Sequence, residues 1–371
     1  MAPRPKQLSL GLTEKMGFVL IISASICKSV VALFTGVFTG KQHRPASYFR
    51  HVVYTAMRSA SGLATTSQEQ WSYVDTTETY IKWCKSNRVE PSTETLSDGT
   101  RAHWTGNRNA NTVLLYFHGG GFNATGRPEY LDFLSSALES LNQHSDSPRL
   151  AALFLAYDVA PYSTYPTQLR QAALLLTHVL QTLHFRPSHI LLGGDSAGAN
   201  LTLALLGHIL HPHPDPTIPR IELSEGEALK GALLISPWVD FSHTAPSFKR
   251  NGGKDCISVA TLNRWSRNYL GGAPADPWNQ PLAAPQGWWS GLGACVQNVL
   301  VVGGSDEIMI DDILRLGEVL RREWGGGGGE LEVVVAEGEA HDVVLIDRAI
   351  GYRPEDLRMD REVRRWLKEN L

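Results

Sequence analysis

The sequence predicts an α/β fold in which eight mostly parallel strands form one sheet, helices cover both of its faces, and a helical cap precedes it. Two observations support this prediction. From about residue 92, short β-branched runs alternate with longer stretches of helical periodicity, which is the pattern of a parallel sheet. The first 85 or so residues have a helical character and lack strand alternation. We therefore divide the chain into an N-terminal helical segment, 1–85, and a main domain, 86–371.

The predicted strands are apolar runs. Central strands of a parallel sheet read this way because helices bury both of their faces. The first two strands form a hairpin through Asp98-Gly99. The strands are expected at 93–97, 101–105, 112–117, 151–157, 189–194, 231–236, 299–304 and 331–336.

Helical periodicity fills the intervals between these strands. The helices are expected at 127–143, 166–184, 197–210, 258–270, 311–323 and 355–370. Two stretches are expected to be loops, namely the proline-rich segment 211–220 and the five glycines of 325–329.

Size and charge narrow the function classes. A chain of 371 residues exceeds the size at which one core usually stops growing, which fits a large domain with an appendage. Its 34 basic and 37 acidic side chains give a formal charge of −3, too balanced for the positive field that nucleic-acid binding needs. The four cysteines are scattered and have no metal-ligand spacing with histidine. We therefore expect no nucleic-acid partner, no disulfide framework and no metal site.

The segment 17–38 is nearly long enough to cross a bilayer, although Lys28 interrupts it and several hydroxyl residues dilute it. No acidic residue occurs between Lys15 and Gln68, whereas several basic residues do, which would suit an anionic membrane surface. A cap helix packed on the main domain is the favoured interpretation, ahead of membrane contact through 17–38. A cleaved signal peptide is least favoured, because no small-residue cleavage site stands out.

A nucleophile motif lies where one predicted strand ends and a helix begins. Gly194-Asp195-Ser196-Ala197-Gly198 has the pattern Gly-x-Ser-x-Gly, which forms a strained turn that projects the serine hydroxyl above the sheet. The small neighbours make such a turn possible. The alternative is a glycine-rich turn with no catalytic duty.

A glycine-rich loop follows the strand 112–117. His118 is followed by three glycines, whose bare backbone N–H groups can face a developing negative charge. We assign Gly120, Gly121 and the N–H of Ala197 to an oxyanion hole, and we expect His118 to orient the loop. A phosphate-binding turn is disfavoured, because no Lys-Ser/Thr follows.

These two motifs, together with YDVAP (157–161), SPW (236–238) and DPWNQPLAAP (276–285), resemble the hormone-sensitive lipase family of α/β-hydrolases. The resemblance runs from about residue 85 to the C-terminus, and a weaker one points to fungal esterase and steryl-acetate hydrolase-like proteins. Asp158 stands where the family usually has arginine, and Ala199 where a second glycine is common. The resemblance implies an α/β-hydrolase fold with a helical cap, a Ser-Asp-His triad, and carboxylesterase activity. Its substrates would be short-acyl or acetyl esters of a hydrophobic alcohol.

A serine hydroxyl needs an imidazole held by a carboxylate in order to act as a nucleophile. In this fold the acid and then the histidine follow the serine, each after a strand. Asp306 follows the strand 299–304 and matches the family's aspartate, and His341 is the only histidine after it. We therefore predict Ser196, Asp306 and His341 as the triad. Asp240 is the best competing acid; Glu307 and Asp311 are weaker competitors, and Asp342 is expected to face solvent.

The expected reaction is hydrolysis of a small hydrophobic ester through an acyl-enzyme on Ser196, without a cofactor. Two alternatives remain: an acyltransferase or cyclase that uses the same triad, and a non-catalytic small-molecule receptor, which the presence of His341 disfavours. Glycosylation sequons at Asn123 and Asn200 adjoin the predicted site, where a glycan would not fit. This favours an intracellular protein, with membrane association through 17–38 as an option. We expect Trp288 and Trp289 to be ordinary packing residues rather than part of the substrate pocket.

Overall fold

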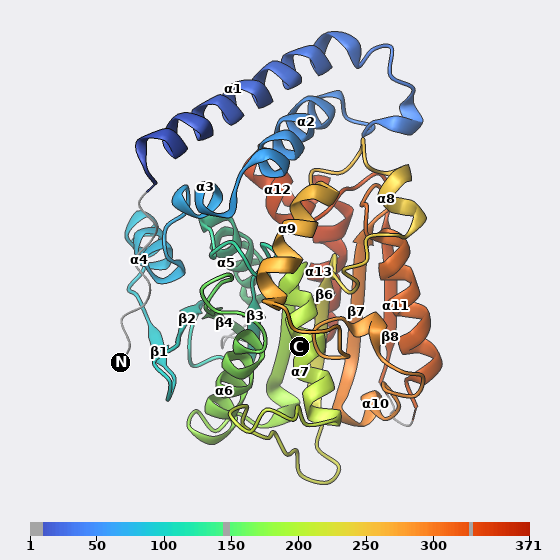
Figure 1. Ribbon diagram of the computed structural model, residues 1–371. Helices are drawn as coiled ribbons and strands as arrows, with labels where there is room; N and C mark the ends of the chain where they lie inside the picture. Colours follow the sequence, from blue (N-terminus) through green and yellow to red (C-terminus); the bar gives the residue numbers. More distant parts are fainter. Residues whose placement is uncertain (1–9, 144–148, 326–328) are drawn as a thin grey trace.

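The computed structural model describes residues 10–143, 149–325 and 329–371. Its eight strands form one sheet in the order β1-β2-β4-β3-β5-β6-β7-β8, in which β2 runs antiparallel to β1 and β4 and the other neighbours are parallel. The predicted α/β fold is confirmed (Figure 1). The strands are β1 (Thr93–Thr95), β2 (Arg101–Thr105), β3 (Thr112–Phe117), β4 (Leu150–Ala156), β5 (Ile190–Asp195), β6 (Leu229–Ile235), β7 (Val296–Gly304) and β8 (Leu331–Ala336).

Alternate residues of each central strand enter two separate cores. In β3, Val113, Leu115 and Phe117 belong to one core, and Leu114 and Tyr116 to the other. The first core is closed by α6 (Thr167–Gln181), α7 (Ala197–Leu210) and α11 (Ile310–Glu323). The second is closed by α5 (Pro128–Asn142), α12 (Val343–Ala349) and α13 (Arg358–Glu369). Burial on both faces explains why these strands are continuous apolar runs.

The N-terminal residues form four helices: α1 (Leu12–Thr35), α2 (Tyr48–Leu63), α3 (Thr66–Trp71) and α4 (Thr76–Asn87). In Figure 1, α1 lies above α2 and runs alongside it at the top of the molecule, and α2 lies beside α12 and α9 (Val259–Leu270). Side-chain hydrogen bonds tie α1 to α2. Ser25 Oγ donates to Ser59 Oγ at 3.1 Å, Ser29 Oγ donates to the Val52 carbonyl at 2.7 Å, and Tyr48 Oη donates to the Leu33 carbonyl at 2.6 Å. The expected domain boundary at 85/86 falls within α4 and stays a prediction.

Three further α-helices went unpredicted because each is too short to show a helical period. They are α8 (Pro246–Arg250), α10 (Leu292–Cys295) and α12, and short 3₁₀ segments occupy Lys41–His43, Pro187–His189, Pro281–Ala283 and Pro354–Asp356. The segment 211–220 contains no helix or strand, as expected. Most of the predicted glycine loop, 326–328, lies outside the described residues.

Helix α1 is the one helix within the described ranges that is long and apolar enough to cross a membrane. Its mean hydropathy over 18 residues is 2.2, and only 11% of that window is buried. Large apolar side chains such as Val19, Leu20, Ile26 and Phe34 are more than half exposed. The contacts of α1 are thus confined to a narrow face toward α2 and α3.

Candidate active site

Ser196 occupies the sharp turn between β5 and α7. Its φ of 49° and ψ of −113° place it at positive φ, where residues with a side chain are strained. The flanking glycines make this turn possible: a Cβ on Gly198 would lie 1.8 Å from the Phe117 carbonyl oxygen, and one on Gly194 would lie 2.4 Å from the Gly198 backbone. The two glycines of the motif are therefore required by close backbone packing.

The glycine loop after β3 lies next to this turn. Gly120 and Gly121 have φ of 90° and 60°, and a Cβ on Gly121 would lie 2.1 Å from the Trp265 ring. Within the described ranges, the backbone N–H groups of Gly120, Gly121 and Ala197 donate to no protein acceptor. These are the three donors predicted for an oxyanion hole, and Gly120 lines the same cavity as Ser196.

The buried side chains of Asp195 and His118 hold the glycine loop in place. The carboxylate of Asp195 accepts hydrogen bonds from Gly119 N at 3.0 Å and from Tyr116 Oη at 2.9 Å. His118 Nδ1 donates to the Gly119 carbonyl at 2.8 Å, and its ring stacks on Tyr157 at 4.1 Å. Burial lowers the pKa of His118 to about 4, so its imidazole is neutral near pH 7. This agrees with the expected orienting role of His118. The role of Asp195 was missed, although its place beside Ser196 was a usable signal.

Asn123 and an N-terminal helix also hold the glycine loop. Asn123 Nδ2 donates to the carbonyls of Gly121 at 2.7 Å and Trp265 at 3.0 Å. Gln70 of α3 in turn donates to the Asn123 carbonyl at 2.8 Å. The glycine loop is thus held between α9 and the N-terminal helix α3.

His341 lies in the loop between β8 and α12, and its acid partner differs from the predicted one. Its Nδ1 is 3.1 Å from Glu307 Oε2, and Glu307 Oε1 accepts a hydrogen bond from Ser236 Oγ at 2.7 Å. Asp306 instead pairs with Lys254 Nζ at 2.8 Å. The structure therefore does not join the predicted Asp306 to the histidine. Adjacent side chains leave this turn in different directions, and the longer one, that of Glu307, reaches the imidazole.

The other competing acids are also accounted for. Asp240 accepts a hydrogen bond from Ser242 N at 2.6 Å, and Asp311 pairs with Arg250. Neither contacts His341. Glu307, considered only as a weaker competitor from the sequence, is the carboxylate on Nδ1.

Asp342 was expected to face solvent, and this expectation is wrong. Its residue exposure is 5%, and its Oδ2 lies 3.0 Å from His341 Nε2. The backbone explains the direction of the side chain, because Asp342 has φ of 50° and ψ of 38° at the start of α12. This left-handed turn points the carboxylate back at the neighbouring ring.

The imidazole of His341 therefore lies between two carboxylates. Burial lowers the pKa of His341, but the charges and hydrogen bonds of Asp342 and Glu307 outweigh burial. The pKa of His341 is therefore raised well above its ordinary value of 6.5. Burial also raises the pKa of Glu307, against the effect of its bond to His341. The contacts of His341 with Glu307 and Asp342 are most stable when the imidazole is protonated.

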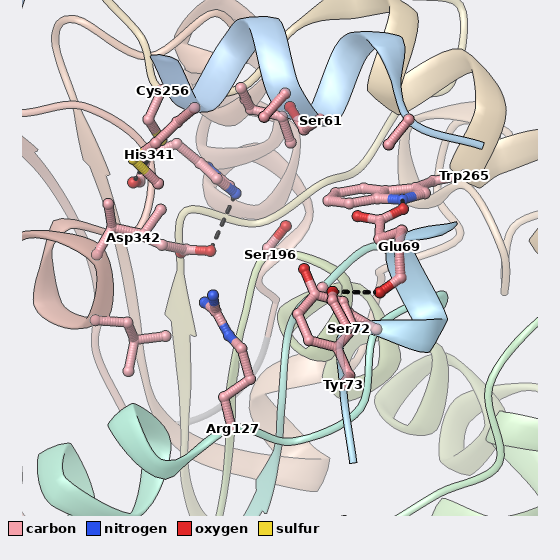
Figure 2. Close-up of a pocket in the computed structure, with 18 of the residues that line it drawn as sticks. Ser61, Glu69, Ser72, Tyr73, Arg127, Ser196, Cys256, Trp265, His341 and Asp342 are labelled. Atoms are coloured by element: carbon pink, nitrogen blue, oxygen red, sulfur yellow. Dashed lines mark hydrogen bonds and ion pairs between the residues drawn. The ribbon is translucent and has the colours of Figure 1, made fainter. Parts of the chain in front are cut away.

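A cavity of about 300 Å³ joins these groups, and both Ser196 and His341 line it (Figure 2). One part of its wall is apolar and comes from Phe18 and Ile22 of α1 and Met57 of α2; Trp265 of α9 also lines it. Its polar lining includes Arg127, Glu69 and Asp342. Among the described residues no hydrogen bond joins Ser196 to His341, whose two ring nitrogens face Glu307 and Asp342.

The tryptophan pair and the sequon asparagines, to which the sequence gave no catalytic role, do not line the cavity. Trp288 and Trp289 are outside this cavity, and Trp289 is fully buried with its backbone N–H on Glu323. Both sequon asparagines, Asn123 and Asn200, are also fully buried. Across the described part of the chain, no cluster of three or more His, Cys, Asp or Glu side chains could hold a metal ion.

The fold and this arrangement agree with a comparison against protein families. Residues 114–345 match the model of a family described by the alpha/beta hydrolase fold. The chain belongs to this family.

Several curated proteins resemble part of the chain. An acetyl-hydrolase of Streptomyces hygroscopicus is 33% identical over 202 residues, 54% of this chain and 58% of that protein. An esterase of Acinetobacter venetianus is 27% identical over 56% of this chain and 61% of its own length. A putative steryl acetyl hydrolase of Schizosaccharomyces pombe is 29% identical over 54% of this chain and 52% of its own length. The matched segment thus spans little more than half of each relative.

Solved structures show the same fold. An esterase from the bacterial hormone-sensitive lipase family superposes with a TM-score of 0.60 at 20% identity, covering 98% of this chain and 99% of its own. An esterase/lipase from an uncultured bacterium gives a TM-score of 0.60 at 23% identity, covering 80% of this chain and 92% of its own. At these identities the likeness concerns the fold alone, including its N-terminal region in the first case.

Proposed function

We propose that this protein is a serine hydrolase that cleaves carboxylic esters. The observation that carries the proposal is one cavity lined by the strained Ser196, by His341 and by Gly120. Behind it, the Glu307 carboxylate contacts His341 Nδ1, and the backbone N–H groups of Gly120, Gly121 and Ala197 donate to no acceptor among the described residues. The naming of three relatives as esterase or acetyl-hydrolase supports the same reaction.

The mechanism follows from these positions. His341 accepts the Ser196 proton on Nε2 while Glu307 holds Nδ1–H and stabilises the imidazolium. Ser196 Oγ adds to the ester carbonyl, and the three backbone N–H groups stabilise the resulting oxyanion. The imidazolium then gives its proton to the leaving alcohol. Water, deprotonated by the same imidazole, releases the acid from Ser196.

The cavity supports a hydrophobic substrate. Phe18, Ile22, Met57 and Trp265 offer apolar surface near Ser196, so an ester with an apolar acyl or alcohol group gains binding energy by leaving water. The names acetyl-hydrolase and steryl acetyl hydrolase of the relatives favour acetyl or short-acyl esters of a hydrophobic alcohol.

Hydrolysis of p-nitrophenyl esters from acetate to decanoate tests the proposal. We expect the parent protein to turn over the short esters and Ser196→Ala to lose about 10⁴-fold or more in kcat, since removing the nucleophile leaves only the binding and oxyanion contributions. Comparable rates for both proteins would contradict the proposal. A fluorophosphonate that fails to label Ser196 would favour the receptor alternative, and transfer to an added alcohol without hydrolysis would favour the acyltransferase.

We further propose that α1 contacts a membrane inside the cell. Its exposed apolar side chains and the absence of acidic residues from 15 to 68 support this. Flotation with phosphatidylcholine–phosphatidylserine vesicles should carry the parent protein upward. The variant Val19→Asp/Phe34→Asp, whose side chains lie outside the cavity, should bind at least about tenfold more weakly, since each change removes apolar burial in lipid. Equal flotation of the two proteins would refute this contact.

A further inference from the structure

Asp342 occupies the ring nitrogen that the proposed mechanism reserves for Ser196. Its Oδ2 lies 3.0 Å from His341 Nε2, as the dashed line in Figure 2 shows. Nε2 is the atom that must accept the serine proton. In this structure the base therefore faces a carboxylate instead of the nucleophile, although both groups line the same cavity.

The position is built into the backbone. Asp342 has a left-handed conformation, and its N–H contacts Ser236 Oγ at 3.3 Å. Glycine and asparagine tolerate this conformation as readily as aspartate does. The turn thus does not by itself require a carboxylate. The other oxygen, Oδ1, is buried without a hydrogen-bond partner, a cost that suggests a carboxylate kept for another purpose.

We propose that Asp342 is a positioning residue that holds His341 in a protonated resting state and must leave Nε2 before His341 can serve Ser196. The proposal rests on the esterase function given above. In the resting state, Asp342 and Glu307 accept hydrogen bonds from the two N–H groups of the His341 imidazolium. In the working state, His341 loses one proton to water, Asp342 turns away, and Nε2 accepts the hydrogen bond from Ser196 Oγ.

The surrounding groups favour the resting state. Besides Asp342 and Glu307, Asp255 accepts a hydrogen bond from His341 N at 3.1 Å, and the Cys256 thiol donates to the His341 carbonyl at 3.5 Å. The buried Asp195 interacts electrostatically with both Asp342 and His341. These carboxylates all stabilise a proton on the imidazole. Arg127 points into the same cavity (Figure 2) and is a cation toward which the released carboxylate can turn.

The consequence is a threshold in pH. A protonated His341 accepts no proton from Ser196, so activity begins only where the imidazole becomes neutral. Two carboxylates in contact with the ring raise the pH at which the imidazole becomes neutral. Removal of one carboxylate lowers this pH. A carboxylate within about 4 to 6 Å shifts such a group by about 1 to 3 pH units.

The test is the pH profile of kcat/KM for p-nitrophenyl butyrate, with the product quantified after quenching. We compare the parent protein with Asp342→Asn and Asp342→Gly, since both replacements tolerate the left-handed backbone. We expect the acid limb of both variants to lie about 1 unit or more below that of the parent. At the pH where the parent retains a tenth of its plateau, each variant then retains half or more. Ring titration of His341 by NMR in the Ser196→Ala background should show the same displacement.

Asp306→Asn is the matched control, because it removes a neighbouring carboxylate that pairs with Lys254 and not with His341. Its acid limb should coincide with that of the parent. An unchanged acid limb in the folded Asp342 variants, or a uniform loss of activity across all pH values, would overturn the proposal. Failure of the esterase function itself is distinguished by Ser196→Ala, which would then remain as active as the parent.

Discussion

Glu307 and Asp306 are adjacent carboxylates with different partners. Glu307 is fully buried and contacts His341 Nδ1, whereas Asp306 pairs with Lys254, whose side chain is 19% exposed. A carboxylate that fixes the histidine tautomer matters far more for catalysis than one in an ion pair that does not contact the imidazole.

The two residues therefore give a direct comparison. Glu307→Gln should lower kcat about 10³- to 10⁴-fold, since an amide would favour the wrong tautomer of His341. Asp306→Asn should leave kcat close to that of the parent and lower the free energy of unfolding by about 1 to 3 kcal/mol, since its pair with Lys254 is largely buried. Steady-state kinetics on p-nitrophenyl butyrate and urea unfolding measure both effects. Loss of activity in Asp306→Asn alone would restore Asp306 as the acid.

The sequence identified some site residues and not others for physical reasons. Ser196 and the glycine loop were predictable, because their backbone geometry admits only small neighbours. His341 was predictable from chain order. The choice between Asp306 and Glu307 was not, since both follow β7 and only side-chain direction separates them. The inward direction of the Asp342 side chain depends on the left-handed backbone of Asp342 itself. This conformation cannot be predicted from the residue type alone.

At the scale of elements, α7 begins with the tightest backbone contact of the site and continues as an ordinary buried helix. Gly198 in its first turn faces the Phe117 carbonyl oxygen, which a Cβ would approach to 1.8 Å. Gly207 in its last turn has room, since its Cβ would meet tryptophan atoms at 3.6 Å and beyond.

These glycines should respond oppositely to the same change. Gly198→Ala should destabilise the protein by more than about 4 kcal/mol or prevent folding, because β3 and α7 would have to separate. Gly207→Ala should be neutral or stabilise the protein by up to about 1 kcal/mol, since alanine favours the helix. Thermal and urea unfolding report both changes. A Gly198→Ala protein as stable as the parent would show that the turn relaxes freely.

The strands were predictable because burial on two faces leaves continuous apolar runs. The long helices were predictable because each repeats its apolar residues over several turns. The exception that concerns function is α12, seven residues long. Its first residues follow the histidine directly. The sequence therefore placed His341 before the final helix without showing the short helix whose start orients Asp342.

At the scale of the whole molecule, the cavity belongs to both parts of the chain. Ser196 and His341 follow the strands β5 and β8, whereas Phe18 and Ile22 come from α1. Phe18 also packs edge-on against Trp71 at 5.9 Å. Substrate selection is therefore expected to depend on a helix far from the nucleophile in sequence.

Neighbouring residues of α1 allow a test. Phe18→Ala should lower kcat/KM for p-nitrophenyl decanoate roughly tenfold and leave the acetate almost unchanged, because only a long acyl chain reaches this wall. Val19→Ala, at an outward position with 63% exposure, should leave both unchanged. An equal loss for acetate and decanoate in Phe18→Ala would mean that α1 supports folding instead of selecting the chain length.

The outer surface of α1 also decides how the purified protein behaves in solution. A row of exposed apolar side chains on one helix has no lipid to meet in a simple buffer, and such surfaces tend to adhere to copies of themselves. Preparations without detergent should therefore self-associate through this helix, and a mild detergent should disperse them into smaller particles on a sizing column.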